Sequence, residues 1–174
     1  MQNNVRRSGF TIIELLVTLA LFSIIATTVT PSLGNFYKRN RVASIVNNHI
    51  SAIQLARHTA VSENVFVVVC PSSDMQNCED DWALSKIVFV DEDGDGSLDG
   101  NEEIIANIEM VNDYRVASTR DSLRFAPFNT AQNNTATITI CPDEETTVFS
   151  RAIVISNVGR VRLEKDQAEI DCTD

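Results

Sequence analysis

The hydrophobic pattern changes twice along this chain of 174 residues. Its first part, Phe10 to Thr30, is apolar almost throughout, with Glu14 and a few hydroxyl side chains as its polar members. About twenty apolar residues are enough for a helix to cross the ~30 Å hydrocarbon core of a bilayer. We therefore expect residues 10–30 to form a transmembrane helix.

A second helical pattern follows Pro31, where a kink is expected but a complete stop is not required. Up to about Ser62, apolar side chains recur at every third or fourth position and form one stripe. The members of the stripe are Val42, Ile45, Val46, Ile53, Ala56 and Ala60. His49 falls on it and is interpreted as structural, since no second ligand stands at a metal-binding offset. Residues 31–62 are thus predicted to continue the helix as an amphipathic half.

Beyond Asn64 the apolar period becomes two, or the apolar runs are continuous, which is typical of strands. The predicted strands are Val65–Cys70, Lys86–Val90, Ile104–Met110, Ser122–Phe125, Thr135–Cys141, Arg151–Ser156 and Val158–Leu163. Short strands after one long helix indicate the α+β class. We expect the second half of the helix to pack on an antiparallel sheet or β-sandwich head formed by residues 63–174.

The residues before the apolar stretch predict an unusual leader. A secretory signal places its small-residue cleavage site after the apolar core. Here Ser8 and Gly9 precede that core, so a cut after Gly9 would leave the helix on the mature chain, with Phe10 as its first residue. Arg6 and Arg7 would keep residues 1–9 in the cytoplasm and send the rest outward.

Glu14 is the one carboxylate in the apolar stretch. Placing it at membrane depth costs roughly 2.5–3.5 kcal/mol, so a partner is expected. Cleavage after Gly9 would create an α-amino group on Phe10, and the amine of a neighbouring copy, shifted lengthwise, could neutralise Glu14. The alternative is a side chain that merely reaches the membrane surface from near the end of the span.

This leader, the sequence Gly-Phe-Thr-x-x-Glu at residues 9–14 and the long apolar helix resemble the class III prepilin signal of type IV pilins and secretion pseudopilins. The resemblance implies that a prepilin peptidase cuts after Gly9 and methylates the amine of Phe10. It also implies that Glu14 takes part in assembly between helices.

Composition and charge indicate which partners the chain can bind and whether its cysteines form disulfides. The net charge is −10, and loss of Arg6 and Arg7 would leave 12 basic against 24 acidic residues, or −12. Such a surface argues against broad contact with nucleic acid or anionic lipid. The four cysteines lie in the part expected outside the cytoplasm, where disulfides form. Three pairings are possible; we favour Cys70–Cys78 as a loop staple and Cys141–Cys172 as a tie for the C-terminal tail.

A longer series of residues indicates which subgroup of these pilins the chain resembles. Leu55-Ala56-Arg57 with Ala60-Val61 is followed by Val65–Ser72, then Trp82, Ile87–Asp91 and a late Gly-Arg-x-Arg. The series is similar to the FimT- and FimU-like minor pilins, relatives of the H-type pseudopilin of type II secretion. It implies a β-sandwich head packed on the helix, few copies, a place at or near the pilus tip and a role in starting assembly. The glycine often found after the tryptophan is absent here.

One acidic loop, DEDGDGSLDGNE, separates two of the predicted strands. Its oxygen-bearing residues and its glycine at position six match the pattern of a calcium loop. The expected ligands of Ca²⁺ are Asp91, Asp93, Asp95, Ser97, Asp99 and Glu102. A strand precedes the loop, whereas an EF-hand has helices on both sides, so a solvated acidic hairpin loop is the alternative. Bound calcium would be structural.

Arg160, Arg162 and Lys165 form the one basic cluster of the head. On a strand both arginines would point to the same face and could span neighbouring phosphates. In FimT-like proteins the matching motif is associated with binding DNA during natural transformation. The alternative is local pairing with Glu164 or Asp166. Three cations would give only weak, salt-sensitive affinity.

No arrangement of nucleophile, base and oxyanion stabiliser stands out, so we expect no enzyme. The favoured function is that of a minor type IV pilin acting in pilus assembly or priming. The alternatives are an H-type pseudopilin of type II secretion and a DNA-binding minor pilin. Expected partners are other major and minor pilins, the prepilin peptidase, the inner-membrane assembly platform and, in the last case, DNA. The chain would cross the inner membrane once, with its C-terminal head in the periplasm, before entering the pilus.

Overall fold

The computed structural model describes residues 9–100, 102–127, 135–142, 149–166, 170 and 172, with the backbone alone at residues 28–32. The chain divides into two compact units. We call Met1–Arg39 the N-terminal unit and Asn40–Asp174 the head unit. The long helix α1 contributes residues to both.

Helix α1 runs from Ile12 to Glu63, a length of 52 residues, and continues through Pro31. Thr11 caps its start, because the Thr11 Oγ1 accepts a hydrogen bond from the Glu14 backbone N–H at 3.3 Å. Its end is set by Asn64, whose φ of 60° is the left-handed conformation that commonly terminates helices. The single long helix is therefore confirmed.

A separate finding concerns hydropathy. Within the described residues, no helix is both long enough and apolar enough to cross a membrane.

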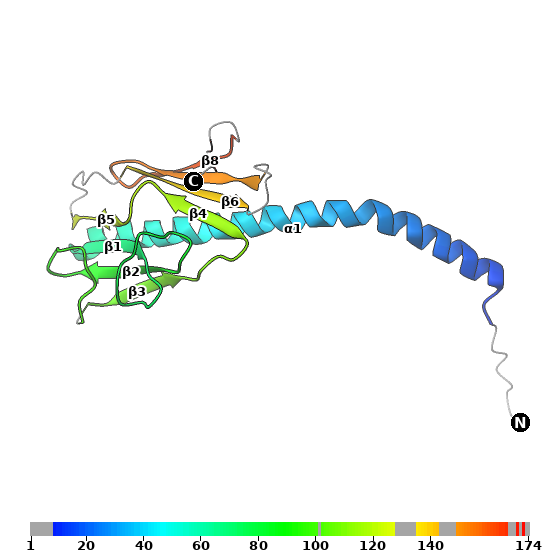
Figure 1. Ribbon diagram of the computed structural model, residues 1–174, viewed down its shortest axis with the longest axis horizontal. Coiled ribbons are helices and arrows are strands. Elements are labelled where there is room, and N and C mark those ends of the chain that lie inside the picture. Colours follow the sequence, from blue (N-terminus) through cyan, green and yellow to red (C-terminus); the bar gives the residue numbers. More distant parts are fainter. Residues whose placement is uncertain are drawn as a thin grey trace, which may run out of the picture. The chain divides into compact units, whose positions relative to one another are not determined.

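In the described part of the head unit, eight strands form two antiparallel sheets (Figure 1). Sheet A has the order β3-β2-β1-β5 and sheet B the order β4-β6-β7-β8. The strands of sheet A are β1 (Phe66–Pro71), β2 (Lys86–Asp91), β3 (Ile104–Ile108) and β5 (Leu123–Phe125). Those of sheet B are β4 (Tyr114–Ser118), β6 (Ala136–Pro142), β7 (Arg151–Ile155) and β8 (Val161–Glu164).

One apolar core joins the helix to both sheets. The predicted stripe of α1 is buried along its whole length, and Ala56 and Ala60 have no exposed surface. It packs with inward side chains such as Val67 and Val88 of sheet A and Ile138 of sheet B. Each fully buried Val or Ile contributes about 1.5–3 kcal/mol through removal from water. The second half of α1 is therefore the centre of the head unit.

Sheet A is also covered on its other face. Val68, Cys70, Ile87 and Phe89 form a second buried group there, packed against half-buried Cys78, Leu98 and Ile104. Strands buried on both faces carry continuous apolar runs instead of alternation. This explains the sequences FVVVC and IVFV in β1 and β2.

The predicted α+β class is confirmed, and each predicted strand corresponds to an observed one within a few residues. One strand, β4, was missed. Its five residues alternate between buried Tyr114 and Val116 and exposed Arg115 and Ala117. Two inward side chains are too few to give a recognisable strand pattern in the sequence. The segment is identified as a strand by its pairing with β6.

Both favoured disulfides are present in the structure. Cys70 pairs with Cys78 and Cys141 with Cys172, with Cα–Cα distances of 5.6 and 6.0 Å. Cys141, Ala152 and Ile170 form a small buried group with Cys172, which fastens the C-terminal tail to sheet B.

We expect the two disulfides to contribute unequally to stability. They are separated by 8 and 31 residues in sequence, and the chain-entropy model assigns about 2–3 kcal/mol to the shorter loop and about 3–4 kcal/mol to the longer. Urea unfolding of the Cys70→Ser/Cys78→Ser and Cys141→Ser/Cys172→Ser double variants should show the larger loss for the second. The reverse order would show that native contacts in the short loop outweigh chain entropy.

Candidate functional site

The N-terminal unit carries a row of exposed apolar side chains. Phe10, Ile12 and Ile13 are 84%, 81% and 71% exposed, and the large apolar residues as far as Ile25 are all more than half exposed. A water-soluble surface rarely shows so large a continuous apolar patch. These side chains therefore require lipid or another chain as their environment.

Glu14 lies in the first turn of α1, amid this apolar surface. A negative charge there interacts favourably with the free N–H groups of the helix start. None of the described residues forms an ion pair with its carboxylate. Gly9 and Phe10, the predicted processing residues, immediately precede the helix and are exposed. The three positions are thus accessible, as the processing and assembly interpretation requires.

The acidic loop joins β2 to β3 and is folded by its own side chains. Asp91, the last residue of β2, has no exposed surface, and its Oδ1 accepts a hydrogen bond from the Gly94 N–H at 2.8 Å. The Asp95 Oδ1 accepts one from the Ser97 N–H at 2.6 Å. Gly94 and Gly96 have φ values of 81° and 87°, which other residues rarely adopt. These bonds explain the tight turn without any ion.

Arg124 of β5 supplies a positive charge to this loop. Its Nε lies 3.2 Å from the buried Asp91 Oδ2, and its guanidinium also donates a hydrogen bond to the Gly94 carbonyl oxygen. The same group lies over the Phe66 ring, 4.5 Å from the centroid. Sequence reasoning missed this arginine, because it lies thirty residues after Gly94 and only the sheet order brings β5 near the loop.

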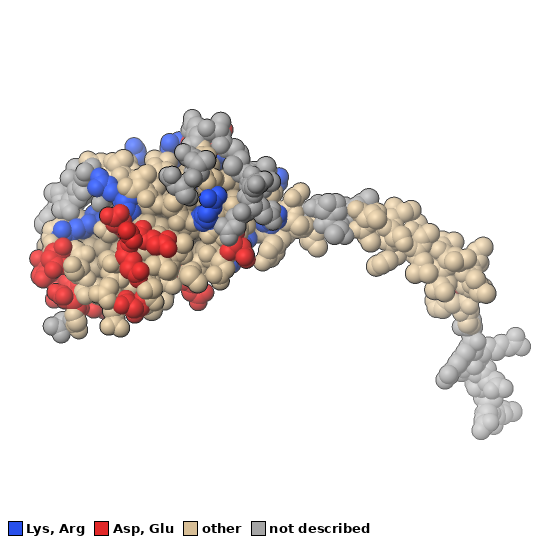
Figure 2. All heavy atoms as spheres, in the orientation of Figure 1, with Lys and Arg blue, Asp and Glu red and all other residues tan. Residues whose placement is uncertain are grey.

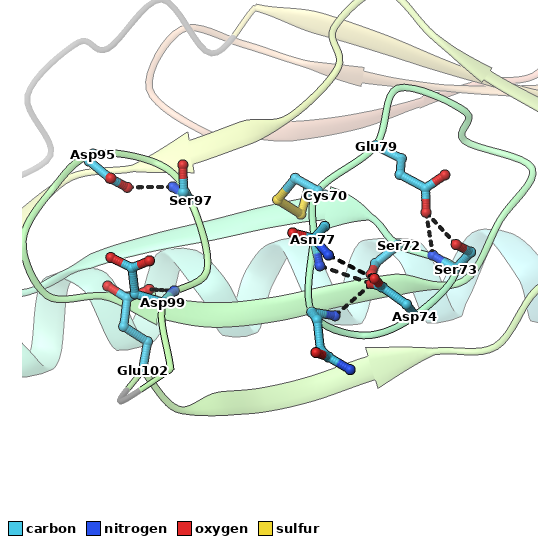
Figure 3. Close-up of a disulfide and its surroundings, with 12 residues drawn as sticks. Cys70, Ser72, Ser73, Asp74, Asn77, Glu79, Asp95, Ser97, Asp99 and Glu102 are labelled. Carbon is cyan, nitrogen blue, oxygen red and sulfur yellow. Dashed lines mark hydrogen bonds between the residues drawn. A yellow bond between two sulfur atoms is a disulfide. The ribbon is translucent and has the colours of Figure 1, made fainter.

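The structure gathers three of the six predicted calcium ligands. Asp91, Asp93 and Asp95 each offer a carboxylate oxygen within 4.8 Å of the others. Glu102 is engaged otherwise, because one of its oxygens accepts a hydrogen bond from the Glu92 N–H at 2.8 Å. The other accepts one from the Asp99 N–H at 3.0 Å (Figure 3). Ser97 and Asp99 are exposed and serve the loop through their backbone N–H groups. Calcium binding stays a prediction.

The loop between Cys70 and Cys78 is likewise held by its own side chains (Figure 3). Asp74 accepts hydrogen bonds from the side chain and backbone of Asn77, from the Gln76 N–H and from the Ser72 hydroxyl. These donors, the Asn77 side chain first, lower the pKa of Asp74 to about 2. The loop is therefore held by a disulfide and by a carboxylate that stays charged at any physiological pH.

The predicted DNA motif lies at the turn between β7 and β8. Gly159 has a φ of 72°, and a Cβ atom there would lie 2.9 Å from the Phe125 ring, so the glycine is structural. Arg160 and Arg162 are exposed. The Arg162 Nη1, however, lies 2.6 Å from the Glu164 Oε2. Glu164 also accepts hydrogen bonds from the Asp166 and Lys165 N–H groups, the main reason its pKa is lowered. Arg162 is therefore paired with a nearby acid, as the alternative to DNA binding predicted.

Two ionisable groups are buried in the head unit; His49 was expected on the apolar stripe, whereas the burial of Lys86 was not expected. Lys86 of β2 has no exposed surface, and burial lowers its pKa to about 8. His49 of α1 is 1% exposed, and burial lowers its pKa to about 4. The His49 Nδ1 donates to the Ile45 carbonyl oxygen at 2.8 Å. Neither the His49 Nε2 nor the Lys86 Nζ has a hydrogen-bond partner in the described part of the chain.

Charges on the head are unevenly distributed. In the view of Figure 2, Asp and Glu side chains gather over sheet A, whereas Lys and Arg are more dispersed. The acidic loop and the stretch from Glu79 to Asp81 account for many acids of the sequence. This distribution favours partners with basic surfaces.

We expect Ca²⁺ to compete with Arg124 for Asp91. Binding to the full chain should therefore be weak, about millimolar, and Arg124→Gln should tighten it about tenfold or more by removing a charge-assisted contact. Titration calorimetry measures both affinities. Asp95→Asn serves as the control that removes a gathered carboxylate. No heat from either the wild type or Arg124→Gln would leave the loop a solvated acidic turn.

We expect Glu164 to oppose any contact of Arg162 with DNA. Glu164→Gln should bind duplex DNA more tightly than the wild type at low salt, because it frees Arg162 and removes a repelling charge. Arg160→Ala/Arg162→Ala should not bind. A salt series followed by fluorescence anisotropy measures this. Equal behaviour of all three proteins would show that the motif does not touch DNA.

Comparisons with known proteins agree with this architecture. Residues 46–159 match the family model described as "Type II transport protein GspH", and residues 4–30 match the prokaryotic N-terminal methylation motif. No curated protein sequence gives a significant match.

Two solved structures share the fold, both of the type IV minor pilin FimU of Pseudomonas aeruginosa (strain PAO1). The first is 22% identical, covers 77% of this chain and 95% of its own, and has a TM-score of 0.60. The second is 21% identical, covers 73% and 94%, and has a TM-score of 0.57. The family model spans more than half of the sequence, on a head of the predicted fold and beside a pilin methylation motif. This chain belongs to the GspH family of pilin-like subunits.

Proposed function

We propose that this chain is a minor subunit of a type IV pilus, cleaved after Gly9, methylated on Phe10 and anchored in the inner membrane before assembly. The observation that carries the proposal is the exposed apolar surface between Phe10 and Ile25, which follows a methylation motif. Lipid would surround this surface before assembly, and the helices of neighbouring pilins would surround it afterwards. The prepilin peptidase and the assembly platform would be its transient partners.

Glu14 would direct the assembly step. Its carboxylate has no ion-pair partner in the described part of its own chain, and in a lipid-like environment an unpaired charge is costly. The methylated amine of a neighbouring subunit, displaced along the helix, would offset it. Lengthwise displacement between neighbours is what a growing filament requires, so one ion pair would set both affinity and register.

The head would make lateral or tip contacts, with a role in starting the filament. Its likeness to a minor pilin supports this role. A pseudopilin of type II secretion is the second candidate, favoured by the description of the matching family model. Deletion in the native host separates the two, since loss of surface pili supports the first and loss of protein secretion with intact pili supports the second.

The assembly proposal makes a direct prediction for Glu14→Ala. The variant should insert in the membrane and be cleaved normally, but its amount in sheared filaments should fall about tenfold or more, because a partly buried ion pair is worth at least about 1.4 kcal/mol. Quantitative immunoblotting of membrane and filament fractions measures this. Thr18→Ala, one turn along the same helix, is the matched control. Normal incorporation of Glu14→Ala would contradict the role of the ion pair.

A further inference from the structure

The edge of sheet A at β3 adjoins a groove in the head unit. The groove has a volume of about 490 Å³ and lies between α1 and the segment from Ala106 to Val111. Its lining includes Arg41, His49 and Leu55 from the helix and Asn107, Glu109 and Met110 from the strand side. Leu55 and Met110 are 38% and 50% exposed, so apolar surface is available on both walls.

We propose that this groove binds an extended segment of another polypeptide chain, which pairs with the outer edge of β3 as a fifth strand of sheet A and places apolar side chains in the groove. The occupant would carry apolar residues at alternate positions and at least one Lys or Arg. This surface is distinct from the exposed apolar segment between Phe10 and Ile25 that would assemble the filament.

The position of β3 at the edge of sheet A favours an occupant in extended conformation. Strand β3 pairs with β2 alone, and no other described strand lies on its outer side. Its sequence, IIANI, contains neither lysine nor proline, the residues that commonly block an edge. Because the register with β2 shifts between Val88 and Phe89, the regular part of the ladder is Ala106–Ile108. That part is also the strand side of the groove.

Side-chain chemistry specifies the occupant further. Alternate residues of an added strand point to the same face, where the exposed Leu55 and Met110 would contact them. Glu109 follows β3, and Glu102 and Glu103 precede it. Acids at both ends of the edge favour a basic partner strand and disfavour a second copy of β3.

A selection with random dodecapeptides displayed on phage tests the inference on the purified full-length chain in detergent. Selected peptides should share alternating apolar residues with Lys or Arg. Met110→Lys should weaken their binding about tenfold or more through repulsion and lost apolar contact. Met75→Lys is the matched control, because Met75 is an exposed methionine, 40% accessible, outside the groove lining. Bound peptide should also slow hydrogen exchange at those β3 amides that do not pair with β2.

Several outcomes would overturn the inference. They are the absence of a shared peptide pattern, a preference for peptides that bind as helices, equal losses in Met110→Lys and Met75→Lys, and unchanged exchange in β3. None of these measurements needs a filament or a membrane. Failure here would therefore leave the assembly role of Glu14 intact, and failure of that role would leave the groove intact.

Discussion

Burial of one stripe of α1 against both sheets is the interaction on which the head depends. Ala56 and Ala60 have no exposed surface, and their small size lets the sheet residues approach the helix closely. Val42, Ile45 and Ile53 occupy the same core as Val67 and Ile138, so the sheets are joined through the helix. The same helix also carries the exposed apolar segment, so one element contributes both the core stripe of the head and the surface proposed for assembly.

Several charged side chains of the head are neutralised or hydrogen-bonded by other residues of the head. Arg124 offsets the buried Asp91, and Glu102 holds the backbone of the loop that follows. Without Arg124, an unpaired carboxylate would remain buried at the end of β2, an arrangement that costs far more than an exposed charge. Glu164 similarly offsets Arg162 at the surface. The sequence suggested ligand sites in the acidic loop and at Arg160 and Arg162. In the structure, partners within the chain already neutralise Asp91 and Arg162.

The long helix, the α+β class and seven of the eight strands could be predicted because each rests on a local pattern of apolar residues. The disulfide pairs followed from loop length and strand position. Strand β4 is defined by its pairing with β6, and the contact between Arg124 and Asp91 by the order of sheet A. In the sequence, Lys86 is the first residue of a predicted strand and nothing indicates that it is buried, yet it has no exposed surface. Such features depend on which elements become neighbours, and a single sequence carries no direct signal of that.

The two family matches cover different parts of the chain. The methylation motif ends at residue 30 and the GspH match begins at residue 46. Under the proposed function, the N-terminal segment would place this subunit in a filament, and the head would determine the identity of its neighbours. Core residues cannot supply that identity, because they are fixed by packing on α1. It would lie in exposed groups. Among the described strands, none pairs with the outer edge of β3, which combines this free edge with the exposed Met110 and with acids at both ends.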